Sequence, residues 1–286
     1  MKCFHHTDAD GKCAAFWVHD RYPHMKQEDF IMIDYGMNIN WFSMIEQNEP
    51  IIIVDFSFDP DDMRKILNKT KNVTWIDHHQ SAIDKYKDFE YNIKGLRYNG
   101  YAGCILTWVY FNRMNDGRIE FDTKMTKEAP WMTKYIHDRD VWKFEFGEET
   151  KHFNLGLDAC GTIKPLDPIW DKLLNIDEVR KLITDGQVIE KYRDAIGARA
   201  VEMYSFETNF HGYKILCLNN IFGGSEWFGD IMDKYDAVCA FMYMGKDKKW
   251  EYSLYSEKID VSKIAKMHGG GGHAGASGFV DDKFIF

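Results

Sequence analysis

The sequence contains no C-x-x-C pair, no apolar run close to the length of a membrane span, and no excess of basic residues. Its six cysteines stand singly, which argues against a zinc ribbon or a thioredoxin motif and is typical of a reducing cytosol. Because no apolar segment approaches about 20 residues, we expect no membrane contact. The N-terminus, "MKCFHHTDADG", lacks the apolar core of a signal peptide. We therefore expect a cytoplasmic protein.

The formal net charge of −9 argues against a protein that tracks long nucleic acids, because such proteins usually carry a basic surface. Small phosphorylated substrates remain compatible with this charge, since bound metal ions could offset it. The chain has 286 residues and 45% apolar content, which is enough for two domains with real cores.

Short β-branched and apolar runs alternate with stretches of helical character in the first part of the sequence. The expected strands are 2–6, 30–35, 50–58 and 73–77, and the expected helices are 11–22, 59–69, 101–115 and 129–140. Strands that alternate with helices predict a parallel sheet. We assign no element between 141 and 176, and 145–151 is the one stretch that we expect to lack order.

Residues 177–206 alternate polar and apolar side chains at helical spacing, which predicts a helix that connects two domains. Further strands are expected at 213–219, 235–243 and 250–256, followed by a short helix and a glycine-rich loop. The predicted fold class is α/β, with an N-terminal parallel-sheet domain and a smaller C-terminal α/β domain. The predicted division is 1–176, the connecting helix 177–206, and 207–286.

Acids and histidines follow three of the predicted strands, and a fourth group follows a predicted helix. These groups are "HHTDADG" at 5–11, Asp55 after "IIIV", "DHH" at 77–79, and Asp138 with Asp140 in "IHDRDVW". Taken singly, each has an ordinary explanation: a helix N-cap at Asp10, a turn at Asp55, a solvated histidine pair, an exposed charge cluster. Parallel strands, however, bring their carboxyl ends to one edge of the sheet, where ligands bind.

Together, these side chains predict a metal site. Mixed imidazole and carboxylate donors suit Mn, Fe, Co or Zn better than Ca. They are also too numerous for one ion, and they fit two metals about 3.5–4 Å apart that activate water for in-line attack on phosphorus. A calcium-binding EF-hand loop that begins at His6 is excluded, because its twelfth position must be Glu and is Trp17.

The run "HGGGGHAGASGF" at 268–279 predicts an anion-binding loop. Consecutive glycines let backbone N–H groups approach a phosphate closely, and His273 can add a donor. A flexible linker is disfavoured, because the run lies between a predicted helix and a final strand. The Lys-Ser/Thr pair of a Walker P-loop is missing.

The five motifs, in this order, resemble those of the DHH phosphoesterase superfamily with its DHH-associated C-terminal domain. The resemblance covers nearly the whole chain and is strongest to the nano-RNase, or oligoribonuclease-like, branch. It implies a DHH catalytic domain at 1–176 and a substrate-binding domain at 207–286. The implied activity is a two-metal phosphodiesterase that hydrolyses short oligonucleotides in an interdomain cleft.

The resemblance also implies a role for each matched residue. His6 and Asp8 resemble ligands of one metal, Asp10, His78 and Asp140 ligands of the second, and Asp55 the bridging carboxylate. His79 would donate to the phosphate or act as general acid, and Asp77 would orient a neighbouring imidazole. The implied phosphate-holding residues are Gly270, Gly271, Gly272 and His273. The implied cofactor is a pair of divalent ions, first of all Mn²⁺, with Mg²⁺ or Co²⁺ as alternatives.

Several alternatives stay open at this point. Some relatives place a histidine where this chain has Phe4, which leaves His5 as the alternative to His6. Related C-terminal domains often carry Arg where this chain has Tyr255. Spacing alone does not separate Asp138 from Asp140. Another small phosphorylated substrate, a phosphomonoesterase or a polyphosphate or pyrophosphate hydrolase, a nucleotide-binding module without turnover, and an oligomeric state are all compatible with the sequence.

Overall fold

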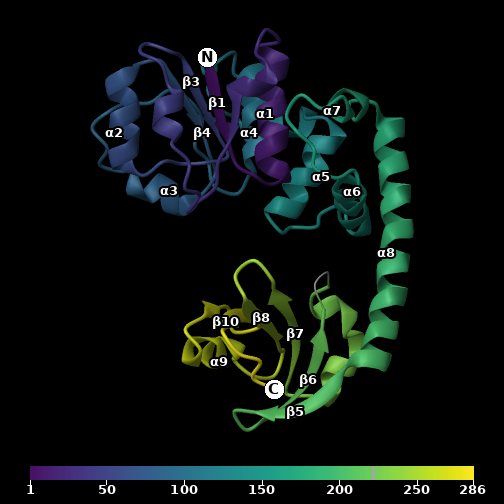
Figure 1. The fold of residues 1–286 in the computed structure, drawn as a ribbon. Coiled ribbons are helices and arrows are strands. Elements are labelled where there is room, and N and C mark those ends of the chain that lie inside the picture. Colours follow the sequence, from purple (N-terminus) through teal and green to yellow (C-terminus); the bar gives the residue numbers. More distant parts are fainter. Residues whose placement is uncertain (221–222) are drawn as a thin grey trace. The chain divides into compact units, whose positions relative to one another are not determined.

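The structure, a computed structural model, describes residues 1–220 and 223–286 and divides into two compact units, Met1–Val188 and Ile189–Phe286. Each unit combines a β-sheet with helices (Figure 1), which confirms the predicted two-domain α/β fold. The division falls inside the long helix α8, Ile176–Tyr204, so the two ends of this helix belong to different units.

The sheet of the first unit has four strands in the order β2-β1-β3-β4, and all of its pairs are parallel. These strands are β1 (Lys2–His5), β2 (Phe30–Met32), β3 (Ile51–Val54) and β4 (Val73–Ile76). The last residues of the three neighbouring strands β1, β3 and β4 are in register, because His5 pairs with Val54 and Val54 with Ile76. The residues that follow these strands therefore emerge at one edge of the sheet.

Both faces of this sheet are buried, as its continuous apolar runs predict. Ile51 and Ile53 of β3 pack on one side in a cluster with residues of helices α2 (Pro60–Lys69) and α3 (Gln80–Lys85). The alternate residue Ile52 packs on the other side with α1 (Ala9–Arg21) and α4 (Gly103–Asn112). Figure 1 shows these helix pairs flanking the sheet. The short strands are thus fixed in place from both sides.

The remaining helices of the first unit include two, α6 and α7, that the sequence did not predict. The remaining helices are α5 (Trp131–Asp140), α6 (Glu148–Ala159) and α7 (Ile169–Lys172). Helix α6 begins within 145–151, so the expectation of disorder there was wrong. The segment is held because Glu145 and Phe146 donate their backbone N–H groups to the buried Asp138, and because Phe153 packs fully buried in the core.

The second unit is built on a mixed sheet in the order β5-β6-β7-β8-β10-β9, in which only β6 and β7 pair in parallel. Its elements after α8 are β5 (Phe206–Phe210), β6 (Tyr213–Asn219), β7 (Ala237–Met244), β8 (Lys249–Tyr255), α9 (Val261–Met267), β9 (Gly271–Gly272) and β10 (Ala276–Asp281). Within the described residues of both units, no helix combines the length and the apolar content that crossing a membrane requires.

Candidate metal centre

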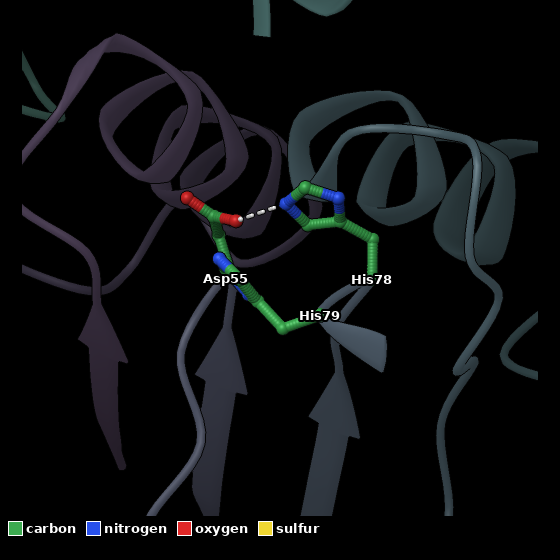
Figure 2. Close-up of side chains that lie close together, drawn as sticks. All are labelled: Asp55, His78 and His79. Carbon is green, nitrogen blue, oxygen red and sulfur yellow. Dashed lines mark ion pairs between the residues drawn. The ribbon is translucent and has the colours of Figure 1, made fainter. Parts of the chain in front are cut away.

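Asp55 lies at the middle of the edge where the parallel strands end. It follows β3 directly with a φ of 53°, a left-handed conformation that aspartate tolerates and β-branched residues avoid. The side chain is buried, and among the described residues no group donates a hydrogen bond to its Oδ1. The Nε2 of His78 lies 3.2 Å from Oδ1 (Figure 2). Burying a carboxylate oxygen without a hydrogen-bond donor costs free energy of folding unless a cation binds it.

His6 and Asp8 approach Asp55 from the loop between β1 and α1. The Nδ1 of His6 lies 2.7 Å from Asp8 Oδ2 and 3.8 Å from Asp55 Oδ2. Asp8 is also the N-cap of α1, because its Oδ1 accepts from the N–H of Gly11 at 2.9 Å. The capping role that the sequence offered to Asp10 therefore belongs to Asp8.

Asp10 points across the unit to a different helix. Its two carboxylate oxygens accept from the backbone N–H groups of Gly103, at 2.6 Å, and Cys104, at 2.7 Å, in the first turn of α4. This helix comes unusually close to the centre. A Cβ on Gly103 would lie 2.5 Å from the Cβ of Asp55, so only glycine fits there. The N-terminus of α4 thereby fixes Asp10 and Asp55 side by side.

The opening of α3 supplies both histidines of the "DHH" motif. His78 Nε2 lies 3.2 Å from Asp55, 3.6 Å from Asp140 Oδ2 and 3.8 Å from Asp10 Oδ2. The fully buried Asp77 uses Oδ1 to accept from His79 Nδ1 at 2.7 Å and from the backbone N–H of His78 at 2.8 Å. Asp77 therefore orients the imidazole of His79, and the Nε2 of His79 remains available to the metal centre.

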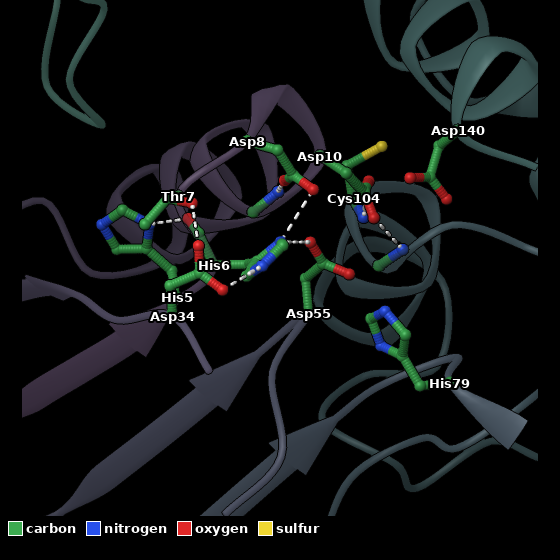
Figure 3. Close-up of polar contacts among 12 residues, drawn as sticks. His5, His6, Thr7, Asp8, Asp10, Asp34, Asp55, His79, Cys104 and Asp140 are labelled. Atoms are coloured by element: carbon green, nitrogen blue, oxygen red, sulfur yellow. Dashed lines mark hydrogen bonds and ion pairs between the residues drawn. The ribbon is translucent and has the colours of Figure 1, made fainter. Parts of the chain in front are cut away.

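Asp140 and Asp138 occupy different environments, although both lie in the last turn of α5. Asp140 joins the centre through His78 and lies near Asp10 (Figure 3). Asp138 is turned away: its oxygens accept from the N–H groups of Glu145 and Phe146 and from the hydroxyl of Thr150. The structure thus places Asp140 in the site and gives Asp138 the task of holding the following segment.

The two candidate histidines of β1 are separated in the same way. His5 is buried, its Nδ1 lies 2.8 Å from the carbonyl oxygen of His6, and burial lowers its pKa to about 4. His6 joins the centre, and its second nitrogen, Nε2, lies 3.2 Å from Asp34 Oδ1 (Figure 3). Sequence reasoning missed Asp34, although it lies two residues after the apolar strand β2, much as Asp55 follows β3. A carboxylate on the outer nitrogen of a histidine fixes the ring orientation that a metal ligand needs.

The electrostatics of the centre show an excess of negative charge. Burial, followed by the neighbouring charges of Asp10 and Asp8, raises the pKa of Asp55 well above its ordinary value. The same causes, in the same order, raise the pKa of Asp140 to about 8. The hydrogen bond to Asp8 is the largest cause that raises the pKa of His6, to about 9. Four clustered carboxylates do not all ionise without a counter-charge.

The donor atoms form three overlapping groups, and the atoms within each group lie within 4.8 Å of one another. The groups are His6 with Asp8 and Asp55, Asp10 with His78 and Asp140, and Asp55 with His78 and His79. Asp55 and His78 belong to two groups each, so the groups adjoin. Nitrogen and carboxylate donors in this arrangement fit divalent transition metals. The residues present therefore fit the expected metals, and the geometry permits His79 to act as a further ligand or to face a substrate.

The glycine run lies in the second unit and is more ordered than a free loop. Gly271 and Gly272 form β9, which pairs with Gly278 and Ser277 of β10. The backbone N–H of His273 donates to Ala276 O at 2.8 Å in a tight turn, and the side chain of His273 is exposed. Several backbone N–H groups of the run thus already have partners, and the exposed imidazole of His273 is the feature best suited to an anion.

No family model matches the sequence. An uncharacterised protein, R106, of Acanthamoeba polyphaga mimivirus is 24% identical over 255 residues, covering 82% of this chain. This chain spans about half of that relative, 53% of its length.

Solved structures resemble the fold more broadly. The DHH domain of a protein assigned to a family of ribosomal proteins matches with a TM-score of 0.54 and 14% identity, over 98% of this chain and 82% of the other. A pGpG-specific phosphodiesterase from Vibrio cholerae matches with a TM-score of 0.49 and 11% identity, over 98% and 93%. RecJ from Thermus thermophilus, in complex with Mn²⁺, matches with 0.45 and 12%, over 98% and 49%. The first of these matches shows a DHH-type fold, so the expected resemblance is confirmed at the level of fold. The nano-RNase branch stays a prediction.

Proposed function

We propose that this chain, which has the DHH fold, is a metal-dependent phosphodiesterase of nano-RNase type that hydrolyses short oligonucleotides. The observation that carries the proposal is the position of Asp55. Its buried carboxylate, with one oxygen that accepts no hydrogen bond among the described residues, belongs to two donor groups, one with His6 and Asp8 and one with His78 and His79. A shared carboxylate between two adjoining donor groups is what a two-metal phosphoester hydrolase requires.

The proposed ligands are His6 and Asp8 on one side and Asp10, His78 and Asp140 on the other, with Asp55 shared. We propose two divalent ions, first of all Mn²⁺, which when bound would activate water and offset the charge of the phosphate.

The side chains around the ligands have supporting tasks. Asp34 orients His6, and Asp77 orients His79. The hydrogen bond that His79 Nδ1–H donates to Asp77 raises the pKa of His79, so the imidazolium is favoured and its Nε2–H can donate to a phosphoryl oxygen or to the leaving hydroxyl.

Substrate binding is assigned to the second unit as part of the same proposal. The glycines Gly270 to Gly272 and His273 would hold a substrate phosphate. The exposed imidazole of His273 supports this assignment. The six free cysteines, five of them buried, support a reducing location such as the cytoplasm.

The decisive experiment measures product release from a diribonucleotide with Mn²⁺, with EDTA, and with the variant Asp55→Asn. We expect turnover that requires the metal and falls by at least about 10³-fold in the variant, because shared ligands act as a unit. If wild type and variant release equal product, the hydrolase proposal fails and a nucleotide-binding module without turnover is favoured. Turnover of pyrophosphate or polyphosphate alone would replace the phosphodiesterase by a hydrolase of those substrates.

A second pair of variants tests the division of tasks within "DHH". His78→Ala should weaken Mn²⁺ binding in calorimetry, because His78 lies beside three of the proposed ligands. His79→Ala should keep both ions and lose turnover. Anomalous scattering from Mn²⁺-soaked crystals should show two peaks about 3.5–4 Å apart. Loss of one peak in His79→Ala would reassign His79 as a ligand.

A further inference from the structure

Next to the metal centre, the first unit contains a cavity of about 420 Å³ that the proposed chemistry does not use. We call it the lysine groove. Its lining includes Tyr101, Lys124, Lys127, Trp131, Lys134 and Lys143. It lies where the loop before α4, the turn at Thr123–Glu128 and helix α5 come together.

The groove is positively charged, although the chain as a whole carries −9. Among the described residues, Lys124, Lys127 and Lys134 form no ion pair within 4.0 Å, whereas Lys143 lies 3.8 Å from Glu145. Desolvation is the only cause that shifts the pKa of Lys134, and it lowers that pKa, as expected for an amine without a carboxylate partner.

The other titratable groups of the groove do not cancel this charge. The carboxylate of Asp138 is occupied by N–H and hydroxyl donors, and burial lowers the pKa of His137 to about 4, so that its imidazole is neutral. Four lysines therefore face two lining carboxylates, Asp138 and Glu145. A concave basic site on an acidic protein is suited to a polyanion.

Aromatic rings lie among the lysines. Trp131 is 41% exposed, and the Nζ of Lys134 lies 4.8 Å from its ring centroid. Tyr101 stacks on His137 with ring centroids 5.4 Å apart, and Lys143 lies 5.3 Å from the Tyr101 ring. Cations interleaved with accessible rings are the features by which proteins hold single-stranded nucleic acid, since the cations bind phosphates and the rings stack on bases.

The groove and the metal centre are joined by one backbone segment, residues 101–104. The N–H of Ala102 donates to His137 Nδ1 at 3.1 Å, and the next two N–H groups donate to Asp10. Tyr101 thus lines the groove while Gly103 contacts the centre. On α5, Asp140 follows His137 by three residues, about 4.5 Å along the helix axis.

We infer that the lysine groove binds the nucleotides of a single-stranded oligonucleotide that extend beyond the scissile phosphate. This inference rests on the proposed function and narrows its substrate class: oligomers of three or more nucleotides bind better than dinucleotides. Lys124 and Lys127 bind backbone phosphates, and Trp131 stacks on a base.

The test is a charge reversal of two exposed groove lysines, Lys124→Glu/Lys127→Glu. Its matched control, Lys172→Glu/Lys181→Glu, reverses two exposed lysines elsewhere in the first unit that form no ion pair among the described residues. With Mn²⁺, KM for a tetranucleotide should rise about tenfold in the groove variant, because two phosphate contacts are lost, while KM for a dinucleotide stays unchanged. An equal change for both substrates, no change, or the same effect in the control would overturn the inference.

Fluorescence anisotropy of a labelled tetranucleotide in EDTA separates this inference from the proposed function. If the wild type hydrolyses neither substrate but the groove variant still binds the tetranucleotide about tenfold more weakly, the hydrolase proposal fails and the groove stands. Unchanged binding would remove the groove.

Trp131→Ala distinguishes an oligonucleotide from an inorganic polyanion. It should weaken binding of the tetranucleotide and leave that of polyphosphate unchanged, because only a nucleotide carries a base to stack. Equal weakening of both ligands, or none, would overturn the stacking assignment. Far-UV circular dichroism and thermal melting check that each variant is folded.

Discussion

The same substitution at two neighbouring carboxylates should have opposite consequences for the metal-free protein. Asp10→Asn should lower the free energy of unfolding strongly, whereas Asp55→Asn should leave it unchanged or raise it. Both variants should lose metal binding, since both residues belong to the proposed ligand set. The contrast separates a carboxylate that stabilises the fold from one that is present for the metal.

The magnitude for Asp10 follows from its two hydrogen bonds. Its oxygens accept from Gly103 N at 2.6 Å and Cys104 N at 2.7 Å, and both N–H groups are buried at the start of α4. An asparagine offers only one oxygen, so one hydrogen bond to a charged acceptor, about 1.5–3 kcal/mol, is lost. The negative charge at the helix N-terminus contributes roughly another 0.3–1 kcal/mol. The expected loss is therefore about 2–4 kcal/mol.

Asp55 has no comparable bonds to lose. No described group donates a hydrogen bond to its Oδ1, and burial and the charges of Asp10 and Asp8 raise its pKa, so its ionised form is disfavoured. Asparagine also tolerates the left-handed backbone found here. We expect the free energy of unfolding of Asp55→Asn to stay within about 0.5 kcal/mol of the wild type, the range of a substitution that breaks no stabilising contact, or to rise.

Urea unfolding followed by tryptophan fluorescence measures this difference, because seven of the nine tryptophans lie in the first unit. In EDTA the midpoint should fall for Asp10→Asn alone. Adding Mn²⁺ should raise the midpoint of the wild type and of neither variant, because a ligand stabilises only the state that binds it. Equal destabilisation of both variants in EDTA, or an unperturbed Asp10→Asn, would refute this account of the site.

Three further predictions concern the same region. Gly103→Ala should lower turnover about 100-fold, because the new Cβ would lie 2.5 Å from the Cβ of Asp55 and displace the carboxylate by about 1 Å. The control is Gly245→Ala, whose Cβ would meet nothing within 4 Å. Equal activity of the two variants would contradict the prediction. In the metal-free protein, the stability that protonated Asp140 contributes is present at low pH and is lost as the pH rises through about 8. Mn²⁺ must displace that proton, so it should raise the melting temperature more at about pH 8.5 than at about pH 6.5. A smaller rise at about pH 8.5 than at about pH 6.5 would contradict the assignment of Asp140 as a ligand. Trp142 is 69% exposed, has a φ of 56° and lies under the guanidinium of Arg139. Trp142→Gly should leave the urea midpoint nearly unchanged, because relief of about 1 kcal/mol of backbone strain offsets the lost cation–π contact. The variant should raise KM for oligonucleotides through loss of base stacking, and an unchanged KM would exclude stacking.

Much of the fold could be predicted from local patterns. The four strands of the first unit are short, apolar and β-branched, and their burial on both faces follows from that composition. Helix α6 could not be predicted in this way. Its first turn is polar, and the segment is held by a distant carboxylate, Asp138, whose partners lie seven, eight and twelve residues away.

The sequence alone determined which chemical groups are available and that they converge. Residues that end neighbouring parallel strands must share one edge, so the convergence of His6, Asp55 and His78 follows from chain order and hydrophobic pattern. Tertiary structure decided the choices between residues of equal chemistry. Asp140 rather than Asp138 joins the centre, and Asp10 holds a helix 93 residues further along the chain. The reason is physical: side-chain type is local, whereas the direction in which a side chain points, and the partner that satisfies it, depend on how distant segments pack.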